Sequence, residues 1–171
     1  NEISISQRGE YAEIWVKVNN LEDPEIIQKL YEASAAGVHI KLCVRSICRI
    51  KPGVAGLSEN ISVCRVVGNY LEHSRIFIFH NEGKQDMYLG SADWMTRNMK
   101  TRIEVVFPIL NQKIKKEVLK FMEIQFTPSV KTQFLSDDLQ PIPYAEKPAQ
   151  YCAQVAFYKI LKGPGKKKST S

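Results

Sequence analysis

The clearest indication of the fold comes from Glu13–Arg45, with the sequence EIWVKVNNLEDPEIIQKLYEASAAGVHIKLCVR. Its first six residues alternate and favour β structure, which predicts a strand. Asp23 followed by Pro24 is typical of a helix start, with Asp as the N-cap and Pro in the first helical position. Gly37 predicts the end of that helix, and a second run of strand-forming residues, 38–44, comes next. This order predicts two parallel strands joined by a right-handed helical crossover.

The remaining segments extend this unit into an α/β domain. Arg45 directly follows the second strand, so it lies at the edge where open α/β sheets bind ligands. Further strands are predicted at 61–67, 76–79, 87–89 and 102–108, with a loop over 46–60 and a hairpin turn at 81–84. Residues 2–7 fit a strand or the end of a helix equally well.

Two helices are predicted in the last third of the chain. The first begins at Asn111 and stops before Pro128, with one stripe formed by Ile114, Val118, Phe121, Met122 and Gln125. The second runs from about Pro148 to Gly163, with Tyr151, Val155, Tyr158 and Leu161 on one side. The first pattern is that of an amphipathic helix, with lysines on the far face.

The composition is that of one globular domain. The chain has 171 residues, of which 44% are apolar and 25% charged, so it can bury a core. No apolar run approaches the roughly 18 residues that cross a bilayer, and the N-terminus lacks a secretion signal. Because the chain begins at Asn1 rather than Met, we expect a segment cut from a longer protein. Residues 1–162 would form the domain, and 163–171 a flexible basic tail.

Cysteine usage and charge suggest the compartment and the partners. The four cysteines have no zinc-binding spacing, so we expect reduced, mostly buried thiols in a cytoplasmic protein. The net charge is +6, and part of it lies in the terminal tail. The remainder favours a polyanionic partner, whether nucleic acid, a phosphate chain or anionic lipid.

His73 is the leading candidate for chemistry. It stands before the strand 76–79, and Arg75 follows it by two residues. Side chains at positions i and i+2 of a strand share a face, so the two can project together. Such a pair suits phosphoryl chemistry, because histidine can move a proton or attack phosphorus and arginine can bind two phosphate oxygens. Taken alone, however, this spacing is more often a polar pair on a surface.

The segment Gly90-Ser91-Ala92-Asp93 adds context, since small residues after a strand let a ligand approach the backbone. The order of His-x-basic, a strand, and then Gly-Ser-x-polar resembles a half-site of the phospholipase D superfamily, which reads H-x-K, four residues, D, and later G-S-x-N. Two positions depart from that pattern. Arg75 replaces the lysine, and His80 stands at the aspartate, so His80 does not inherit the orienting role. The resemblance implies a mixed sheet flanked by helices, with further helices at the C-terminus.

A more specific resemblance rests on four blocks, VNNLEDPEIIQKLYEASAAGVHIKLCVRSICRIKPGVAGLSENISV, YLEHSRIFIF, YLGSADWMTRNMKTRIEVVFPI and VKTQFL. In this order they look like the C-terminal domain of the bacterial polyphosphate kinase family. The segments EHSR, SADWMTRN and VRSIC…PG are the specific ones. The resemblance covers the chain from about Trp15 to Leu161.

This resemblance implies an enzyme that reversibly transfers the terminal phosphate of ATP to polyphosphate through a phosphorylated histidine. That histidine belongs to a domain upstream of this chain, and His73 matches a second histidine that faces it. Arg45 matches an arginine that contacts the nucleotide phosphates, and Arg75 is expected to bind ATP or polyphosphate beside it. Mg²⁺ is the expected cofactor, with its ligands upstream.

The resemblance also implies partners. These are ATP, ADP and polyphosphate, the remaining domains of the same enzyme, and further copies in a dimer or tetramer, but not nucleic acid. The isolated chain is expected to be inactive. A cytoplasmic location is expected, and the family resemblance leaves room for peripheral association with a membrane.

Two other functions compete with this one. A phospholipase-D-type phosphodiesterase or nuclease could build its site from two identical half-sites, although the missing Lys and Asp disfavour it. A non-enzymatic module that binds nucleic acid rests on charge alone, because the aromatic residues are not interleaved with basic ones.

The other candidates are weaker. Arg97 and Arg102 could line a phosphate tunnel, or they could belong to a solvated or salt-bridged face of the protein. Trp94 is expected to pack rather than stack on a base, His39 to be a structural histidine within its strand, and Arg65 to be surface charge.

Overall fold

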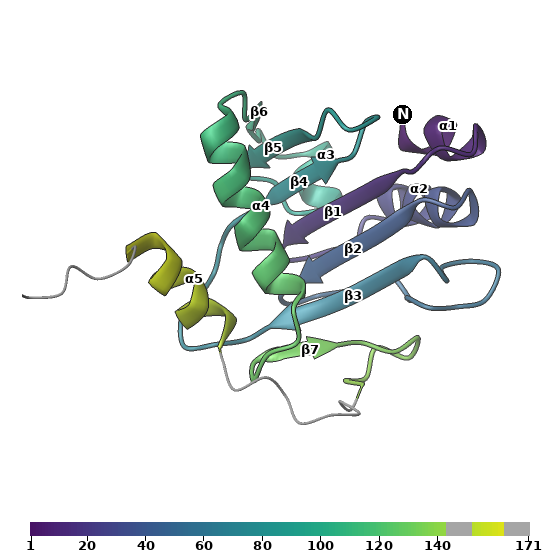
Figure 1. Ribbon diagram of the computed structural model, residues 1–171. Helices are drawn as coiled ribbons and strands as arrows, with labels where there is room; N and C mark the ends of the chain where they lie inside the picture. Colours follow the sequence, from purple (N-terminus) through teal and green to yellow (C-terminus); the bar gives the residue numbers. More distant parts are fainter. Residues whose placement is uncertain (143–151, 163–171) are drawn as a thin grey trace, which may run out of the picture.

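The computed structural model describes residues 1–142 and 152–162. The strands are β1 (Glu13–Val18), β2 (His39–Val44), β3 (Ile61–Val66), β4 (Ile76–Phe79), β5 (Asp86–Gly90), β6 (Val106–Pro108) and β7 (Thr132–Phe134). The helices are α1 (Glu2–Gln7), α2 (Pro24–Ala35), α3 (Thr96–Lys100), α4 (Gln112–Phe126) and α5 (Ala153–Lys162). The strands form one mixed sheet of seven in the order β6-β5-β4-β1-β2-β3-β7, with helices on both faces (Figure 1). The predicted α/β class is confirmed.

The predicted strand–helix–strand unit is also confirmed, with β1 and β2 parallel. The side chain of Asp23 caps α2 by accepting hydrogen bonds from the backbone N–H groups of Glu25 and Ile26. These are donors that a helix start would otherwise leave unpaired. Gly37 follows α2 with φ of +94°, a conformation that L side chains rarely adopt, so glycine ends the helix there.

The strand order brings several chain segments to one edge of the sheet. β1, β2 and β3 are parallel, whereas β4 runs antiparallel to β1. The register places Val18 of β1 beside Val44 of β2, and Lys17 of β1 beside Ile76 of β4. The carboxyl ends of three strands and the start of β4 therefore share an edge, next to α5 (Figure 1).

Different helices cover the two faces of the sheet. Leu30 of α2 belongs to the same buried cluster as Val16 of β1. On the opposite face, Met122 of α4 is buried with Ile78 and Met87. Figure 1 shows α4 crossing in front of the sheet and α2 behind it. Because both faces of β1 are covered, even polar side chains of this strand can be buried.

Two expectations about the second half of the chain need correction. The strand predicted at 102–108 is formed only by Val106–Pro108. The hydroxyl of Ser91 accepts the N–H of Val105 in place of a strand neighbour, and Ile103 is fully exposed. In α4, Ile114 of the predicted stripe lies in the first turn and is also exposed.

The last helix, α5, buries a different side from the one that carries Val155, Tyr158 and Leu161. Its described part begins at Ala153, and the start predicted at Pro148 lies outside the described residues. Ala153 and Gln154 are buried, whereas Val155, Tyr158 and Leu161 are exposed. The predicted tail, 163–171, also lies outside the described residues.

Of the segments left open, residues 2–7 form a helix, α1. The thiols of Cys43 and Cys64 are buried, those of Cys48 and Cys152 are partly exposed, and all four are free. Within the described residues, no helix is long and apolar enough to span a membrane.

Candidate functional site

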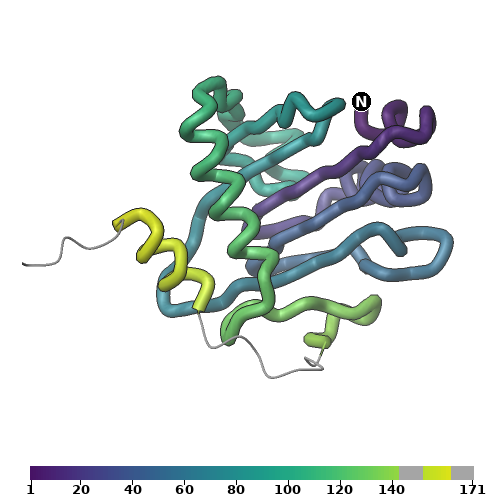
Figure 2. The backbone as a smooth tube through the Cα atoms, in the orientation of Figure 1, coloured from purple at the N-terminus to yellow at the C-terminus, as the bar shows by residue number. Residues whose placement is uncertain are grey.

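His73 lies in the connection between β3 and β4, which runs beside α5 along the edge of the sheet (Figure 2). The residue is exposed, and its ring makes no hydrogen bond or ring contact within the part of the chain that the structure describes. Its backbone carbonyl accepts a hydrogen bond from Nη1 of Arg75 at 2.8 Å. The backbone of His73 is thus held while its imidazole remains free to meet a ligand.

Arg75 forms a two-point pair with Asp93, which follows β5. Nε of Arg75 lies 3.2 Å from Oδ1 of Asp93, and Nη2 lies 3.3 Å from Oδ2. Asp93 also accepts the backbone N–H of Asn19 at 2.8 Å and Nδ2 of Asn20 at 3.0 Å. The expected role of Arg75 in phosphate binding stays a prediction; in this structure Arg75 joins His73 to the loop after β1.

These contacts change the acidity of Asp93. Burial raises the pKa of this carboxyl, but hydrogen bonds from Arg75, Asn19 and Asn20 outweigh burial, so the pKa lies below its ordinary value. Asp93 is therefore ionised at neutral pH and neutralises Arg75. Sequence reasoning singled out the segment Gly90–Asp93 but not this role. The signal for it is the acidic residue where the phospholipase D pattern has asparagine.

Arg45 follows β2, where its N–H donates to the carbonyl of Val18. Its side chain is half-buried, and Nη1 is buried without an acceptor among the described residues. An unpaired buried donor is costly, more so on a charged group. This nitrogen is therefore suited to an acceptor supplied from outside, such as a phosphate oxygen.

The register brings Arg45 close to residues 68–75, the part of the β3–β4 connection that contains His73 and is called the histidine segment below. β1 alone separates β2 from β4, so the residues that follow β2 and precede β4 lie about 10 Å apart along the sheet edge, two strand spacings. Arg65, at the end of β3, is half-buried as well: its Nη2 donates to the carbonyl of Ser46 at 3.0 Å, and its Nε is buried without an acceptor within the described ranges. The expectation of plain surface charge at Arg65 is therefore wrong. The edge carries three arginines beside one histidine.

The other candidate residues lie outside this cluster or have packing roles. Trp94 stacks on Phe77 with ring centroids 5.4 Å apart, which confirms that it packs. His39 and His80 both contact the ring of Tyr11 at the opposite edge of the sheet. His39 is exposed at the first position of β2, not enclosed within its strand.

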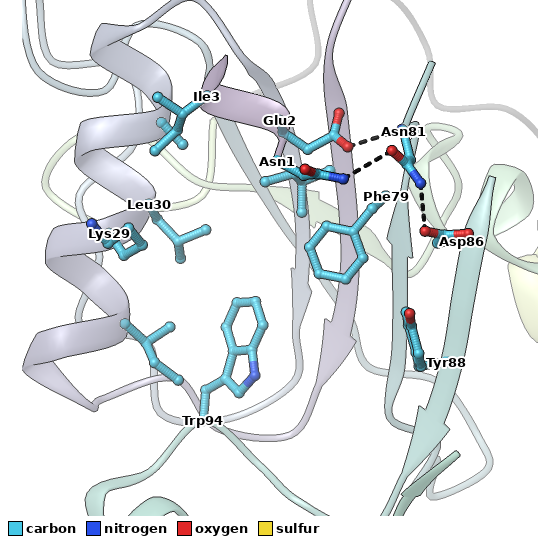
Figure 3. A pocket seen from close by; sticks show the side chains of 13 residues that line it. Asn1, Glu2, Ile3, Lys29, Leu30, Phe79, Asn81, Asp86, Tyr88 and Trp94 are labelled. Atoms are coloured by element: carbon cyan, nitrogen blue, oxygen red, sulfur yellow. Dashed lines mark hydrogen bonds between the residues drawn. The ribbon is translucent and has the colours of Figure 1, made fainter. Parts of the chain in front are cut away.

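A cavity of about 610 Å³ opens between α2 and the β4–β5 hairpin (Figure 3). Side chains of Asn1, Glu2, Asn81 and Asp86 are hydrogen-bonded at one end, and Trp94 lies at the other (Figure 3). Its wall is mostly apolar and includes two carboxylates, so it does not suit a polyanion. None of the arginines at the sheet edge lines it. The candidate site is therefore the edge, not this cavity.

A family described as polyphosphate kinase C-terminal domain 2 matches residues 1–154. The chain belongs to this family. It is 50% identical to a polyphosphate kinase of Exiguobacterium over 133 residues, 78% of this chain and 18% of that protein. It is 43% identical to a polyphosphate kinase of Yersinia pestis over 163 residues, 94% of this chain and 24% of that protein. The chain thus spans about a quarter or less of these relatives.

Solved structures agree with the polyphosphate kinase family. The crystal structure of polyphosphate kinase from Porphyromonas gingivalis matches with a TM-score of 0.87 and 42% identity, covering 94% of this chain and 25% of that one. The phospholipase D family member Nuc from Salmonella typhimurium matches with a TM-score of 0.55 and 16% identity, covering 78% of this chain and 88% of that one. The second likeness confirms the phospholipase-D-like fold only.

Among the described residues, no group of three or more His, Cys, Asp or Glu side chains gathers to hold a metal ion. The edge that carries His73 is basic, which suits phosphate oxygens rather than a cation. The described residues therefore do not fit a Mg²⁺ site.

Proposed function

We propose that this chain supplies the second-histidine half of a polyphosphate kinase active site. The reaction is the reversible transfer of the terminal phosphate of ATP to polyphosphate through a phosphohistidine outside this chain. The observation that carries the proposal is the exposed ring of His73 at the same sheet edge as the buried Nη1 of Arg45, neither of which has a partner among residues 1–142 and 152–162. One group can move a proton, and the other can bind a phosphate oxygen.

The transfer would occur in two steps. In the first, the bond between the γ-phosphorus and the ADP oxygen breaks as a bond to the upstream histidine forms. In the second, that P–N bond breaks as a terminal oxygen of polyphosphate attacks the phosphorus. Two displacements replace one difficult step. His73 would give a proton to the leaving phosphate oxygen in one direction and remove it in the other.

The arginines would offset the charge of the phosphate groups. Arg45 is the first candidate, because its side chain already leaves an N–H without an acceptor among the described residues. Arg75 would act nearby, with Asp93 limiting how far its guanidinium turns. Preorganised donors of this kind stabilise charge that develops in a transition state. We propose that Mg²⁺ is held by residues outside this chain.

The proposal extends to partners. ATP, ADP and polyphosphate would be the substrates, the other domains of the same polypeptide would complete the site, and the enzyme would act as a dimer or tetramer. The chain alone would be inactive, since the phosphorylated histidine is not in it.

The test is synthesis of polyphosphate by the full-length enzyme that carries this chain. His73→Ala should abolish synthesis and leave the circular dichroism spectrum and melting temperature unchanged, because an exposed side chain adds little to the core. Arg45→Ala should raise the Kd for ATP by about 10- to 150-fold, the loss of a charge-assisted contact of about 1.5–3 kcal/mol. Arg49→Ala, at an exposed arginine, is the control. Near-wild-type synthesis by His73→Ala would refute the proposal.

A second assay separates the phosphodiesterase alternative. The purified chain is incubated with bis(p-nitrophenyl) phosphate, and release of nitrophenol is followed. No turnover is expected. Turnover that disappears in His73→Ala would instead indicate a phospholipase-D-type hydrolase built from two copies.

A further inference from the structure

Lys17 is a buried lysine close to the candidate site. It lies on β1, and its side chain is 3% exposed. Its position beneath α4 is shown by Oε1 of Gln125, which accepts from Nζ of Lys17 at 3.3 Å. Burial lowers the pKa of this ammonium, but the neighbouring Cys43 and Glu72 outweigh burial, so the pKa is above its ordinary value. Lys17 is thus a charged group under the sheet edge. Such groups are rare in protein cores unless they are paired.

The partner of Lys17 is the residue that precedes His73. Nζ of Lys17 and Oε2 of Glu72 form an ion pair at 2.8 Å, and the Glu72 side chain is only 15% exposed. A charge that is largely removed from water needs an opposite charge close to it. Removing one member of this buried ion pair therefore costs far more stability than removing one member of an ion pair on the surface. The contact therefore fixes the backbone next to His73.

A second anchor comes from α5. Nε2 of Gln154 donates to the other carboxylate oxygen of Glu72 at 2.9 Å and to the carbonyl of Tyr70 at 2.7 Å. The N–H of Tyr70 donates back to Oε1 of Gln154 at 3.0 Å. Gly68 packs so closely on this amide that an added Cβ would lie 2.2 Å from Oε1 of Gln154. The amide thus clamps the connection just before the histidine.

The histidine segment is therefore held from two sides. On one side, Glu72 is bound by Lys17 and Gln154. On the other, the carbonyl of His73 accepts from Arg75, which is paired with Asp93. Yet this segment belongs to no helix or strand, and residues 69–71 and His73 itself are exposed. Such a segment would be mobile without these contacts.

We propose that Lys17 is a positioning residue for His73: through its buried ion pair with Glu72, and with Gln154 of α5, it holds the connection that presents the imidazole to the phosphoryl group. This inference rests on the proposed function for its catalytic consequence, but the anchoring can be measured without it. Because its side chain is only 3% exposed, Lys17 would not contact the substrate itself. It acts by reducing the number of positions that His73 can occupy, and a displacement of about 1 Å in a catalytic group can lower a rate about 100-fold.

The first test measures anchoring in this chain alone. Lys17→Met removes the charge and keeps most of the volume. Amide hydrogen exchange of residues 68–75 should become at least about tenfold faster, while exchange in β1 and β2 stays as in the wild type. Lys41→Met is the matched control: Lys41 is paired at 3.2 Å with Glu13, which begins β1 at the end opposite to the sheet edge that carries His73. Unchanged exchange in Lys17→Met would overturn the proposal.

The second test measures positioning in the full-length enzyme. Lys17→Met should lower kcat for polyphosphate synthesis about 100-fold and leave KM for ATP within about threefold, the pattern of a lost transition-state contact. Met122→Ala, which truncates a fully buried side chain on the sheet-facing side of α4, should lower the melting temperature, but kcat measured below the melting temperature should stay unchanged. This control separates positioning from stability.

A third variant tests whether the two charges act as a unit. Lys17→Met combined with Glu72→Gln leaves no unpaired buried charge, and the glutamine can still accept from Gln154. Its kcat should be no lower than that of Lys17→Met and should recover in part. If the kcat of the double variant is lower than that of the wild type by the product of the factors measured for Lys17→Met and for Glu72→Gln alone, the two charges do not act as a unit and the clamp is contradicted.

These experiments distinguish a failure of the positioning role of Lys17 from a failure of the proposed function. If His73→Ala abolishes synthesis while Lys17→Met keeps wild-type kcat, the positioning role is wrong and the proposed function stands. If His73→Ala retains synthesis, the proposed function fails, and the exchange experiment still decides whether Lys17 anchors the connection.

Discussion

Asp93→Ala is expected to be among the more damaging single changes in this domain. The carboxylate is 7% exposed and accepts from the guanidinium of Arg75, the backbone N–H of Asn19 and the amide of Asn20. Alanine would leave a largely buried cation and a buried N–H without acceptors. Removing one partner of a buried ion pair costs about 3–5 kcal/mol, a large part of the roughly 5–15 kcal/mol that holds a domain together.

Urea unfolding of the purified chain, followed by tryptophan fluorescence, measures this loss. Asp93→Asn should cost less, about 1–3 kcal/mol, because the amide oxygen can still accept one hydrogen bond. Asp137→Ala is the matched control: Asp137 is exposed, and no change in the midpoint is expected.

The pH dependence gives an independent check. The pKa of Asp93 is lower in the folded protein than its ordinary value of 3.8. Its contribution to stability is therefore complete well above pH 3.8 and is lost as the pH falls through the lower, folded-state pKa. The difference in unfolding free energy between wild type and Asp93→Asn should be constant at neutral pH and shrink below about pH 4. A loss under about 1 kcal/mol for Asp93→Ala, or a difference that grows in acid, would refute the reasoning.

Three further outcomes are expected of this chain. Asp23→Ala removes the cap of α2 and should lower the unfolding free energy by about 1 kcal/mol; a change below about 0.3 kcal/mol would mean that water replaces the cap. Glu2→Ala leaves the N–H groups of Glu13 and Asn81 without their acceptor, so protease cleavage near the β4–β5 turn should accelerate while the rest of the domain resists; uniform cleavage would contradict a local role. Iodoacetamide labelling, followed by mass spectrometry, should modify the two partly exposed cysteines first, because Cys43 and Cys64 are buried. Cys43 should stay protected even though a hydrogen bond from Cys64 lowers its pKa to about 7; rapid labelling of Cys43 would show that the sheet opens.

Local sequence signals were sufficient wherever structure depends on local contacts. The cap at Asp23 and the turn around Gly83 are produced by neighbouring residues, so spacing alone predicted them. The same holds for placing Arg45 at the end of a strand. Phosphate chemistry at His73 is predicted by its spacing from Arg75 and by the segment Gly90–Asp93, together with the family resemblance.

Features that depend on distant contacts were not predictable from spacing. β7 has only three residues and no alternation, and it exists because β3 offers it an edge. Lys17 reads as a solvent-facing residue of a strand, but Gln125, which helps to bury it, is 108 positions away. Asp93 pairs with Arg75 across 18 positions, and the sequence around neither residue predicts the other as its partner. The candidate site thus combines residues visible in the sequence with supports that only the fold brings together.

The strand at one end of the sheet has a consequence for handling this domain. β6 pairs with β5 on one side only within the described residues, and Val106 and Phe107 are about half exposed. Very short edge strands and proline limit pairing with another molecule, and β6 has three residues, of which the last is Pro108. The half-exposed side chains of Val106 and Phe107, rather than the free backbone groups, are therefore the part of this edge that can associate with a second molecule. At high concentration the separated domain should self-associate through these side chains, and a lysine in place of Val106 should keep it monodisperse.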